Sequence, residues 1–213
     1  MRDQVKFIAV AGNLGVGKST LVDYLCRTYG WTPFTEPNEE NPFLDDFYED
    51  MSRWAFNSQI SFLAHKFRIH LELMETAGTV VQDRSIYEDA EIFARHLVKM
   101  DAMDDREWAT YQNLYTAMNR VLRPPDLLLY LKCGLQTIRK RIRQRGRESE
   151  QDIPVEYIKR LNRLYGSWLR RYDLSPVVVI RTDKLDYISD FVHRQDLDEI
   201  LRPFLSGGDD RSS

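Results

Sequence analysis

The chain has 213 residues, of which 43% are hydrophobic and 30% charged, and its formal net charge is −3. That length suits one α/β domain with its own core, and the mildly acidic balance predicts neither a nucleic-acid partner nor an anionic membrane partner. No apolar run reaches the length of a membrane span, and the first predicted strand begins too near Met1 for a targeting peptide. We therefore expect a cytoplasmic protein with one domain over residues 1–205 and a flexible tail over 206–213.

The first predicted elements are a buried strand over residues 5–11, a glycine-rich turn and a helix that follows Lys18. The turn fits the phosphate-loop pattern G-x-x-x-x-G-K-[ST], and its residues are Gly12, Asn13, Leu14, Gly15, Val16, Gly17, Lys18 and Ser19. In such a loop, backbone N–H groups bind phosphate oxygens at a helix N-terminus. Lys18 can reach the β- and γ-phosphates, and the Ser19 hydroxyl can hold Mg²⁺. The turn therefore predicts that a nucleoside triphosphate and Mg²⁺ bind here.

Strands and helices alternate along the rest of the chain. Apolar spacing predicts strands over residues 31–35, 79–83, 126–132 and 177–181. It predicts helices over residues 43–49, 53–75, 89–99, 104–122, 135–145, 155–172 and 197–205. This order favours an α/β fold in which helices cover both faces of a parallel sheet of four or five strands. Ligands of such a sheet bind beyond the carboxyl ends of its strands.

Charged residues follow two of these predicted strands. Asp83 and Arg84 come at the end of one, and Glu36 follows another. An acid near a phosphate loop suits Mg²⁺, and an arginine beside it suits a phosphoryl group. Glu36 could act as the base that takes a proton from an acceptor hydroxyl. The alternatives without a functional role are a surface ion pair for Asp83 and Arg84, and an ordinary loop position for Glu36, since Glu39 and Glu40 lie close by.

Residues 139–147 form the densest basic stretch of the chain. Such a run usually indicates a solvated helix face or a surface that binds nucleic acid. The chain is acidic as a whole, however, and acids follow the run at once. Arg141 and Arg145 lie four residues apart on one helical face. This pattern favours an arginine-rich lid that closes over a transferring phosphoryl group.

With these motifs in place, the chain resembles the deoxyribonucleoside kinases, especially the bacterial deoxyadenosine/deoxycytidine and deoxyguanosine kinases. The resemblance runs from the phosphate loop to about Tyr172. Its further motifs are Glu36-Pro37-Asn38, Asn41-Pro42-Phe43-Leu44, Phe47-Tyr48, the segments 54–59 and 83–89, and Arg145-Gly146-Arg147-Glu148-Ser149-Glu150. It implies a P-loop kinase with a five-stranded parallel sheet. The implied activity is ATP-dependent phosphorylation of a deoxyribonucleoside 5′-hydroxyl in nucleotide salvage.

The resemblance also implies roles for residues around the reacting atoms. Glu36 resembles the general base, and Arg84 resembles the arginine that holds that base and the 5′ oxygen. Asp83 stands where the family has a Mg²⁺-linked acid. Tyr48 and Glu150 match the pair that binds the sugar 3′-hydroxyl. The remaining matches in this group are the lid arginines Arg141, Arg145 and Arg147.

Other matched residues face the nucleobase. Gln59 matches the glutamine that reads the base, Asp89 matches a carboxylate that faces its exocyclic group, and Phe93 matches an aromatic wall. Lys66 departs from the pattern, because several relatives have an arginine there as the partner of that carboxylate. Asn41 departs as well, since animal members have a tryptophan at this position. Both departures bear on base preference and neither touches phosphoryl transfer.

An acceptor-only carboxylate and an amide favour a base with an exocyclic amino group. We therefore expect deoxyadenosine as the first substrate, then deoxycytidine, deoxyguanosine and thymidine. Deoxyguanosine kinase and a nucleoside monophosphate kinase such as thymidylate kinase are the alternative enzymes, and a nucleotide-binding switch is the alternative outside catalysis. The resemblance implies a homodimer through residues 53–75 and 89–99. It also implies inhibition by the end-product deoxynucleoside triphosphate.

Overall fold

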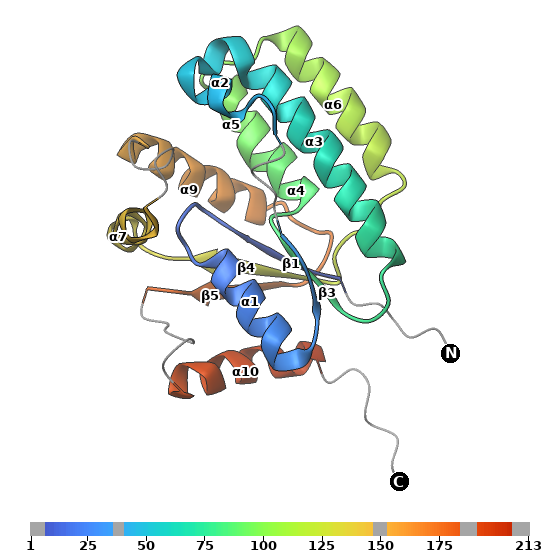
Figure 1. Ribbon diagram of the computed structural model, residues 1–213, viewed down its shortest axis with the longest axis vertical. Coiled ribbons are helices and arrows are strands. Elements are labelled where there is room, and N and C mark those ends of the chain that lie inside the picture. The colour runs from blue at the N-terminus through green and yellow to red at the C-terminus, as the bar shows by residue number, and fades with distance from the viewer. Residues whose placement is uncertain (1–6, 36–40, 147–152, 184–190, 206–213) are drawn as a thin grey trace.

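In the structure, a computed structural model (Figure 1), residues 7–35, 41–146, 153–183 and 191–205 are described, without the side chains of 191–193 and 203–205. The strands are β1 (Phe7–Gly12), β2 (Thr32–Phe34), β3 (Val80–Asp83), β4 (Leu127–Lys132) and β5 (Val177–Arg181). The helices are α1 (Lys18–Tyr29), α2 (Leu44–Glu49), α3 (Met51–Glu75), α4 (Ile86–Glu88), the π-helical η2 (Asp89–Ala94), α5 (Arg95–Val98), α6 (Asp105–Asn119), α7 (Leu135–Arg145), α9 (Val155–Leu169) and α10 (Phe191–Leu205).

The five strands form one sheet in the order β2-β3-β1-β4-β5, and every pair in it is parallel. This confirms the predicted five-stranded parallel sheet. The strands β2 and β3 lie on one side of β1, and the chain then crosses to β4 and β5 on the other side. Crossovers to opposite sides leave a crevice beyond the carboxyl end of β1, which is where α/β sheets bind ligands. The phosphate loop begins at that end, with Gly12.

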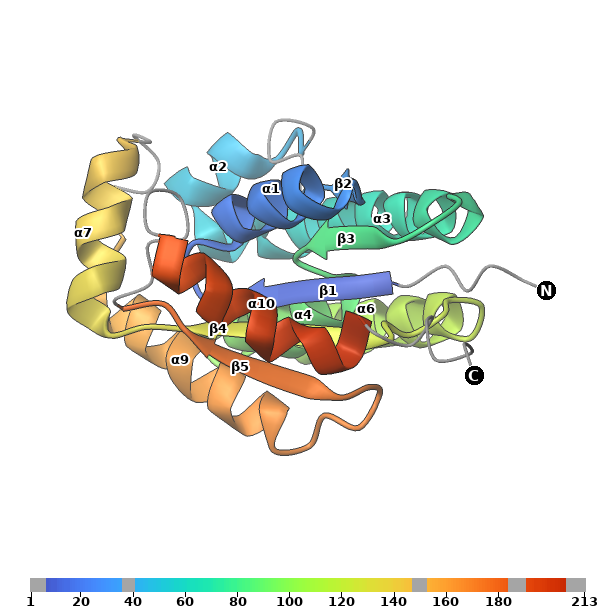
Figure 2. The ribbon, with the colours of Figure 1, turned by 90° about the horizontal axis from the view of Figure 1, so that it is seen from below.

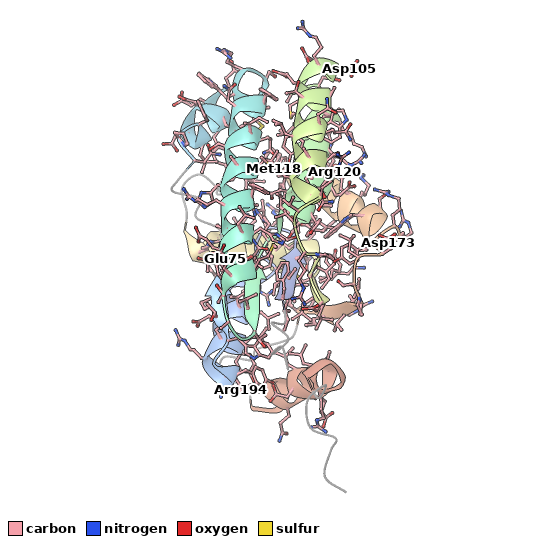
Figure 3. The ribbon with its side chains drawn as sticks, turned by 90° about the vertical axis from the view of Figure 1, so that its right-hand side faces the viewer. Glu75, Asp105, Met118, Arg120, Asp173 and Arg194 are labelled. Atoms are coloured by element: carbon pink, nitrogen blue, oxygen red, sulfur yellow. The ribbon has the colours of Figure 1, made fainter. Side chains whose placement is uncertain are left out.

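Alternating residues of β1 serve two hydrophobic cores because successive strand side chains point to opposite faces. Ile8 and Val10 pack in the core that includes the buried face of α1, together with Leu197 and Leu201 of α10. Phe7, Ala9 and Ala11 belong to the other core, which is built from α3, η2, α6 and α9. Accordingly, α1 and α10 lie on one side of the sheet and the larger group of helices lies on the other (Figures 1 and 2). Within that group α3 and α6 lie side by side (Figure 3).

Three predicted helices begin two or more residues earlier in the structure, and the helices expected to end at 122 and 172 end at Asn119 and Leu169. The helix expected over 89–99 begins at Ile86, because the Ser85 side chain accepts a hydrogen bond from the backbone N–H of Glu88 and caps it. Its middle turns, Asp89–Ala94, are π-helical. The long helix begins at Met51, two residues early, because the Asp50 side chain caps it. The last helix begins at Phe191 rather than Leu197.

The predicted tail, 206–213, lies outside the described residues. Among the helices of the described ranges, none is both long enough and apolar enough to cross a membrane.

Candidate active site

The phosphate loop needs glycine at two positions for steric reasons. Gly12 has φ +148°, and a Cβ there would lie 2.6 Å from the carbonyl oxygen of Leu131. Gly15 has φ +66°, and its Cβ would lie 3.0 Å from the carbonyl oxygen of Ile138. Residues that carry a side chain rarely adopt these φ values, and a Cβ at either position would press against a backbone carbonyl oxygen. The loop can therefore lie close against β4 and α7 while its backbone turns into the start of α1.

Lys18 is buried and bends back over the loop. Its Nζ donates to the carbonyl oxygens of Gly12, at 2.8 Å, and Asn13, at 3.1 Å. An ammonium group has three donors, and these contacts hold it at the mouth of the loop. From this position the group can reach phosphate oxygens bound by the loop.

Side chains from distant parts of the chain anchor the loop. The Asn13 amide donates to the carbonyl oxygen of Ile158, at 3.0 Å, and to Asn162 Oδ1, at 2.8 Å, both in α9. The Arg141 guanidinium of α7 donates to the carbonyl oxygen of Val16 at 2.9 Å. It also donates to the hydroxyl and the carbonyl oxygen of Thr182, at 3.0 and 2.6 Å. Arg141, expected to bind the nucleotide, thus bonds to the backbone of the loop, and its contact with a nucleotide stays a prediction.

Ser19 and Asp83, the two predicted Mg²⁺ ligands, lie together at the ends of adjacent elements. The Ser19 hydroxyl donates to Asp83 Oδ2 at 2.6 Å. Asp83 Oδ1 is buried and has no hydrogen-bond partner among the described residues. A hydroxyl beside a carboxylate oxygen without a partner fits a hard divalent cation. In the described ranges no cluster of three or more histidine, cysteine or acidic side chains adds to the pair.

Arg84 adopts an unusual backbone conformation that directs it into the site. Its φ is +63°, and its N–H donates to the carbonyl oxygen of Val10 at 3.0 Å. The guanidinium carbon lies 4.3 Å from the centre of the Phe93 ring, and Nε lies 3.9 Å from Glu88 Oε1. Positive φ at a residue other than glycine is a strained state that is enriched at functional sites. Two predicted site residues, Arg84 and Phe93, are therefore in direct contact.

The predicted base-reading residues come together between α3 and η2. Lys66 Nζ lies 3.3 Å from Asp89 Oδ2, with both side chains almost fully buried, and donates to the carbonyl oxygen of Arg84 at 2.7 Å. Gln59 is 5% exposed, and its Oε1 is buried with no hydrogen-bond partner in the described ranges. A buried amide oxygen without a partner is costly unless a ligand or water satisfies it. Lys66 thus occupies the place expected of the carboxylate's cationic partner.

Four buried polar residues near this site were not predicted. Glu88 contacts the phosphate loop through the N–H of Gly12 and also bonds to Tyr165. Tyr111 is buried, and its pKa is raised well above the usual value by burial and then by the negative charge of Asp89. Gln82 is buried in β3 with its Oε1 unpartnered in the described part of the chain. Polar residues inside apolar strands and helices were the available sequence signal for all four.

The structure places the remaining predicted residues only in part. Glu36, Arg147 and Glu150 lie outside the described residues. Tyr48 is 41% exposed on α2, and Arg145 is exposed at the last position of α7. Their roles in binding stay predictions.

The sheet order and the phosphate loop at the end of its central strand define the chain as a P-loop kinase. A sequence model of the deoxynucleoside kinase family matches residues 8–206. The chain therefore belongs to the deoxynucleoside kinase family and is a kinase of nucleotide salvage.

Named relatives agree with this assignment. The chain is 40% identical to deoxyadenosine/deoxycytidine kinase of Bacillus subtilis, over 86% of this chain and 85% of the relative. It is 37% identical to deoxyguanosine kinase of Lactobacillus johnsonii, over 89% of this chain and 88% of the relative. A solved structure of deoxyadenosine kinase from M. mycoides with bound dCTP superimposes with a TM-score of 0.79 at 28% identity, covering 92% of this chain and 99% of that one.

Proposed function

We propose that this kinase transfers the γ-phosphoryl group of ATP to the 5′-hydroxyl of deoxyadenosine, with deoxycytidine as the second substrate. The observation that carries the base assignment is the buried Gln59 Oε1, which lacks a described partner beside the Lys66–Asp89 pair. A glutamine amide carries one donor side and one acceptor side. It can bond to the N6 amino group and N7 of adenine, or to the N4 amino group and N3 of cytosine.

Asp89 strengthens the preference for an amino group, because an ionised carboxylate only accepts hydrogen bonds. The carbonyl groups of guanine and thymine would face acceptor oxygens in this pocket. Relatives named as deoxyadenosine kinases, at 33% and 34% identity, support the same base.

Deoxyguanosine is the second candidate, and Lys66 is the observation that favours it. The ammonium lies 3.3 Å from Asp89 and can neutralise that carboxylate, which would weaken its selection against a carbonyl group. The resemblance to named deoxyguanosine kinases points in the same direction.

Phosphoryl transfer in this proposal depends on positioning and charge stabilisation. The N–H groups of the loop and Lys18 bind the donor phosphates, and Arg145 and Arg147 close over them. Glu36 accepts the proton of the 5′-hydroxyl, and Arg84 orients that base and the attacking oxygen. Ser19 and Asp83 would hold Mg²⁺, which when bound neutralises charge on the donor phosphates. Tyr48 and Glu150 bind the sugar 3′-hydroxyl.

Three further proposals concern assembly, regulation and location. The protein forms a homodimer through the helices within residues 53–75 and 89–99. The end-product triphosphate occupies the acceptor pocket and bends its phosphates into the loop, in keeping with the solved relative that holds dCTP. The enzyme acts in the cytoplasm, which cell fractionation tests.

A phosphorylation panel of deoxyadenosine, deoxycytidine, deoxyguanosine and thymidine tests the base assignment. Each mismatched buried polar pair costs about 1–3 kcal/mol, so kcat/KM should span more than about tenfold from first to last. Gln59→Leu should lower kcat/KM for deoxyadenosine about tenfold without changing the KM for ATP. Gln112→Leu, an exposed position on α6, is the matched control. A wild-type preference for deoxyguanosine or thymidine would reject the ranking and identify Lys66 as the dominant reader.

A further inference from the structure

Glu88 is a fully buried acid beside the phosphate loop. It has no role in the proposed phosphoryl transfer. It is 0% exposed, ends α4 and directly precedes Asp89. Burial raises its pKa, while the nearby cations Arg84 and Lys18 act in the opposite direction. A buried carboxyl group is costly unless its hydrogen bonds compensate for the lost hydration.

The hydrogen bonds of Glu88 and of its neighbour Tyr165 hold both backbone polar groups of Gly12. Glu88 Oε1 accepts a hydrogen bond from the N–H of Gly12, with an N···O distance of 3.1 Å. The Tyr165 hydroxyl bonds to the same carboxylate oxygen and lies 2.9 Å from the carbonyl oxygen of Gly12. Gly12 is the first residue of the phosphate loop, where a side chain would collide with Leu131. Glu88 and Tyr165 therefore fix the point from which the loop departs.

Gly12 also lies next to Lys18, the lysine of the loop. Lys18 Nζ donates to the Gly12 carbonyl oxygen at 2.8 Å, the atom that the Tyr165 hydroxyl also approaches. A displaced Gly12 would therefore displace the ammonium that is expected to bind the donor phosphates.

Two consecutive residues thus face different halves of the site. Glu88 reaches the phosphate loop, whereas Asp89 pairs with Lys66 among the base-reading residues. The chain changes from α-helix to π-helix between them. π-Helical turns are frequent at functional sites, and here one separates the donor contact from the acceptor contact.

We propose that Glu88 is a positioning residue for the donor half of the site, which it sets through the hydrogen bond from Oε1 to Gly12, with Tyr165 as its supporting partner. This inference rests on the proposed binding of ATP by the Gly12–Ser19 loop. The accepting oxygen is what positions the loop. Oε2 is buried without a hydrogen-bond partner in the described part of the chain, so a glutamine can replace the acid and keep the Oε1 contact.

The test compares Glu88→Ala with Glu88→Gln in the full-length enzyme. Glu88→Ala should raise the KM for ATP, and the dissociation constant for ATP measured by calorimetry without nucleoside, by about tenfold or more. Glu88→Gln should keep both within about threefold of wild type. The KM for the deoxynucleoside should change little in either variant, because Gln59 and Lys66 are untouched. A purely structural role would lower the melting temperature without separating the two substrates in this way.

Glu91→Ala is the matched control, because Glu91 lies three residues further on and pairs with Arg95 and Arg171. It should leave the KM for ATP unchanged. If Glu88→Ala does not fold, Tyr165→Phe provides the test, and it should weaken ATP binding about three- to tenfold while Glu88 stays in place.

Folded Glu88→Ala with wild-type affinity for ATP would overturn the proposal. Equal weakening in the Ala and Gln variants would also overturn it, because charge rather than the accepting oxygen would then be responsible. Failure of the proposed function looks different, since the wild-type enzyme itself would then bind no ATP in calorimetry.

Discussion

Replacing Lys66 by methionine is the perturbation whose effect the structure defines best. Nζ lies 3.3 Å from Asp89 Oδ2 and 2.7 Å from the carbonyl oxygen of Arg84, and the two charged side chains are 2% and 6% exposed. Methionine keeps most of the length of the side chain and removes the charge and its hydrogen bonds. The buried carboxylate of Asp89 then loses the ammonium group with which it pairs.

The expected effect is large because removing one partner of a buried ion pair exposes the desolvation cost of the other. Such losses are about 3–5 kcal/mol in the free energy of unfolding. For a chain of this size that corresponds to a melting temperature roughly 6–20 °C lower. The lost bond to the Arg84 carbonyl oxygen adds to this, since it supports a backbone at φ +63°.

Chemical denaturation of Lys66→Met, Asp89→Asn and the double variant measures the effect. The double variant should be more stable than the sum of the single losses predicts, by at least about 2 kcal/mol, because it removes both charges of the pair together. Single losses below about 1 kcal/mol, or strictly additive losses, would refute the reasoning. Each of the three variants that folds should bind ATP with a dissociation constant near that of the wild type.

Three further predictions address chemistry, regulation and pH. Glu36→Gln should lower kcat by about 10² to 10⁴ with little change in nucleoside KM, and Glu39→Gln should not, whereas near-normal kcat would remove Glu36 from the mechanism. Initial-rate kinetics should show dATP competing with the deoxynucleoside, and competition with ATP alone would contradict the proposed binding across both sites. His96 lines a hollow of about 370 Å³ with Lys99, Arg160 and Arg163, and burial followed by the charges of Arg160 and Lys99 lowers its pKa to about 4. Near its ordinary pKa, His96 therefore takes up a proton in the unfolded chain but stays neutral in the folded protein. The free energy of unfolding should fall as pH drops from 7 to 5, by about 2 kcal/mol from this residue. Denaturation of His96→Gln should show a shallower loss over that range, and an unchanged pH dependence would exclude His96 as its source.

Local sequence patterns were enough to predict several parts of this protein. The spacing from Gly12 to Ser19 specified the phosphate loop, and apolar runs at β1, β3, β4 and β5, separated by helical segments, specified a parallel sheet. Both signals are short-range, because a turn and a buried strand each follow from a few neighbouring residues. The family resemblance rested on the same local motifs.

The contacts between residues far apart in the chain became visible only in the folded molecule. The Ser19–Asp83 hydrogen bond spans 64 positions, and the Glu88–Gly12 bond spans 76. Arg141 looked like a nucleotide ligand in the sequence, yet across 125 positions its guanidinium bonds to the carbonyl oxygen of Val16. Sequence spacing places a residue on a face of a helix or at the end of a strand. What it contacts depends on strand order and helix packing, which arise from non-local burial that no short motif records.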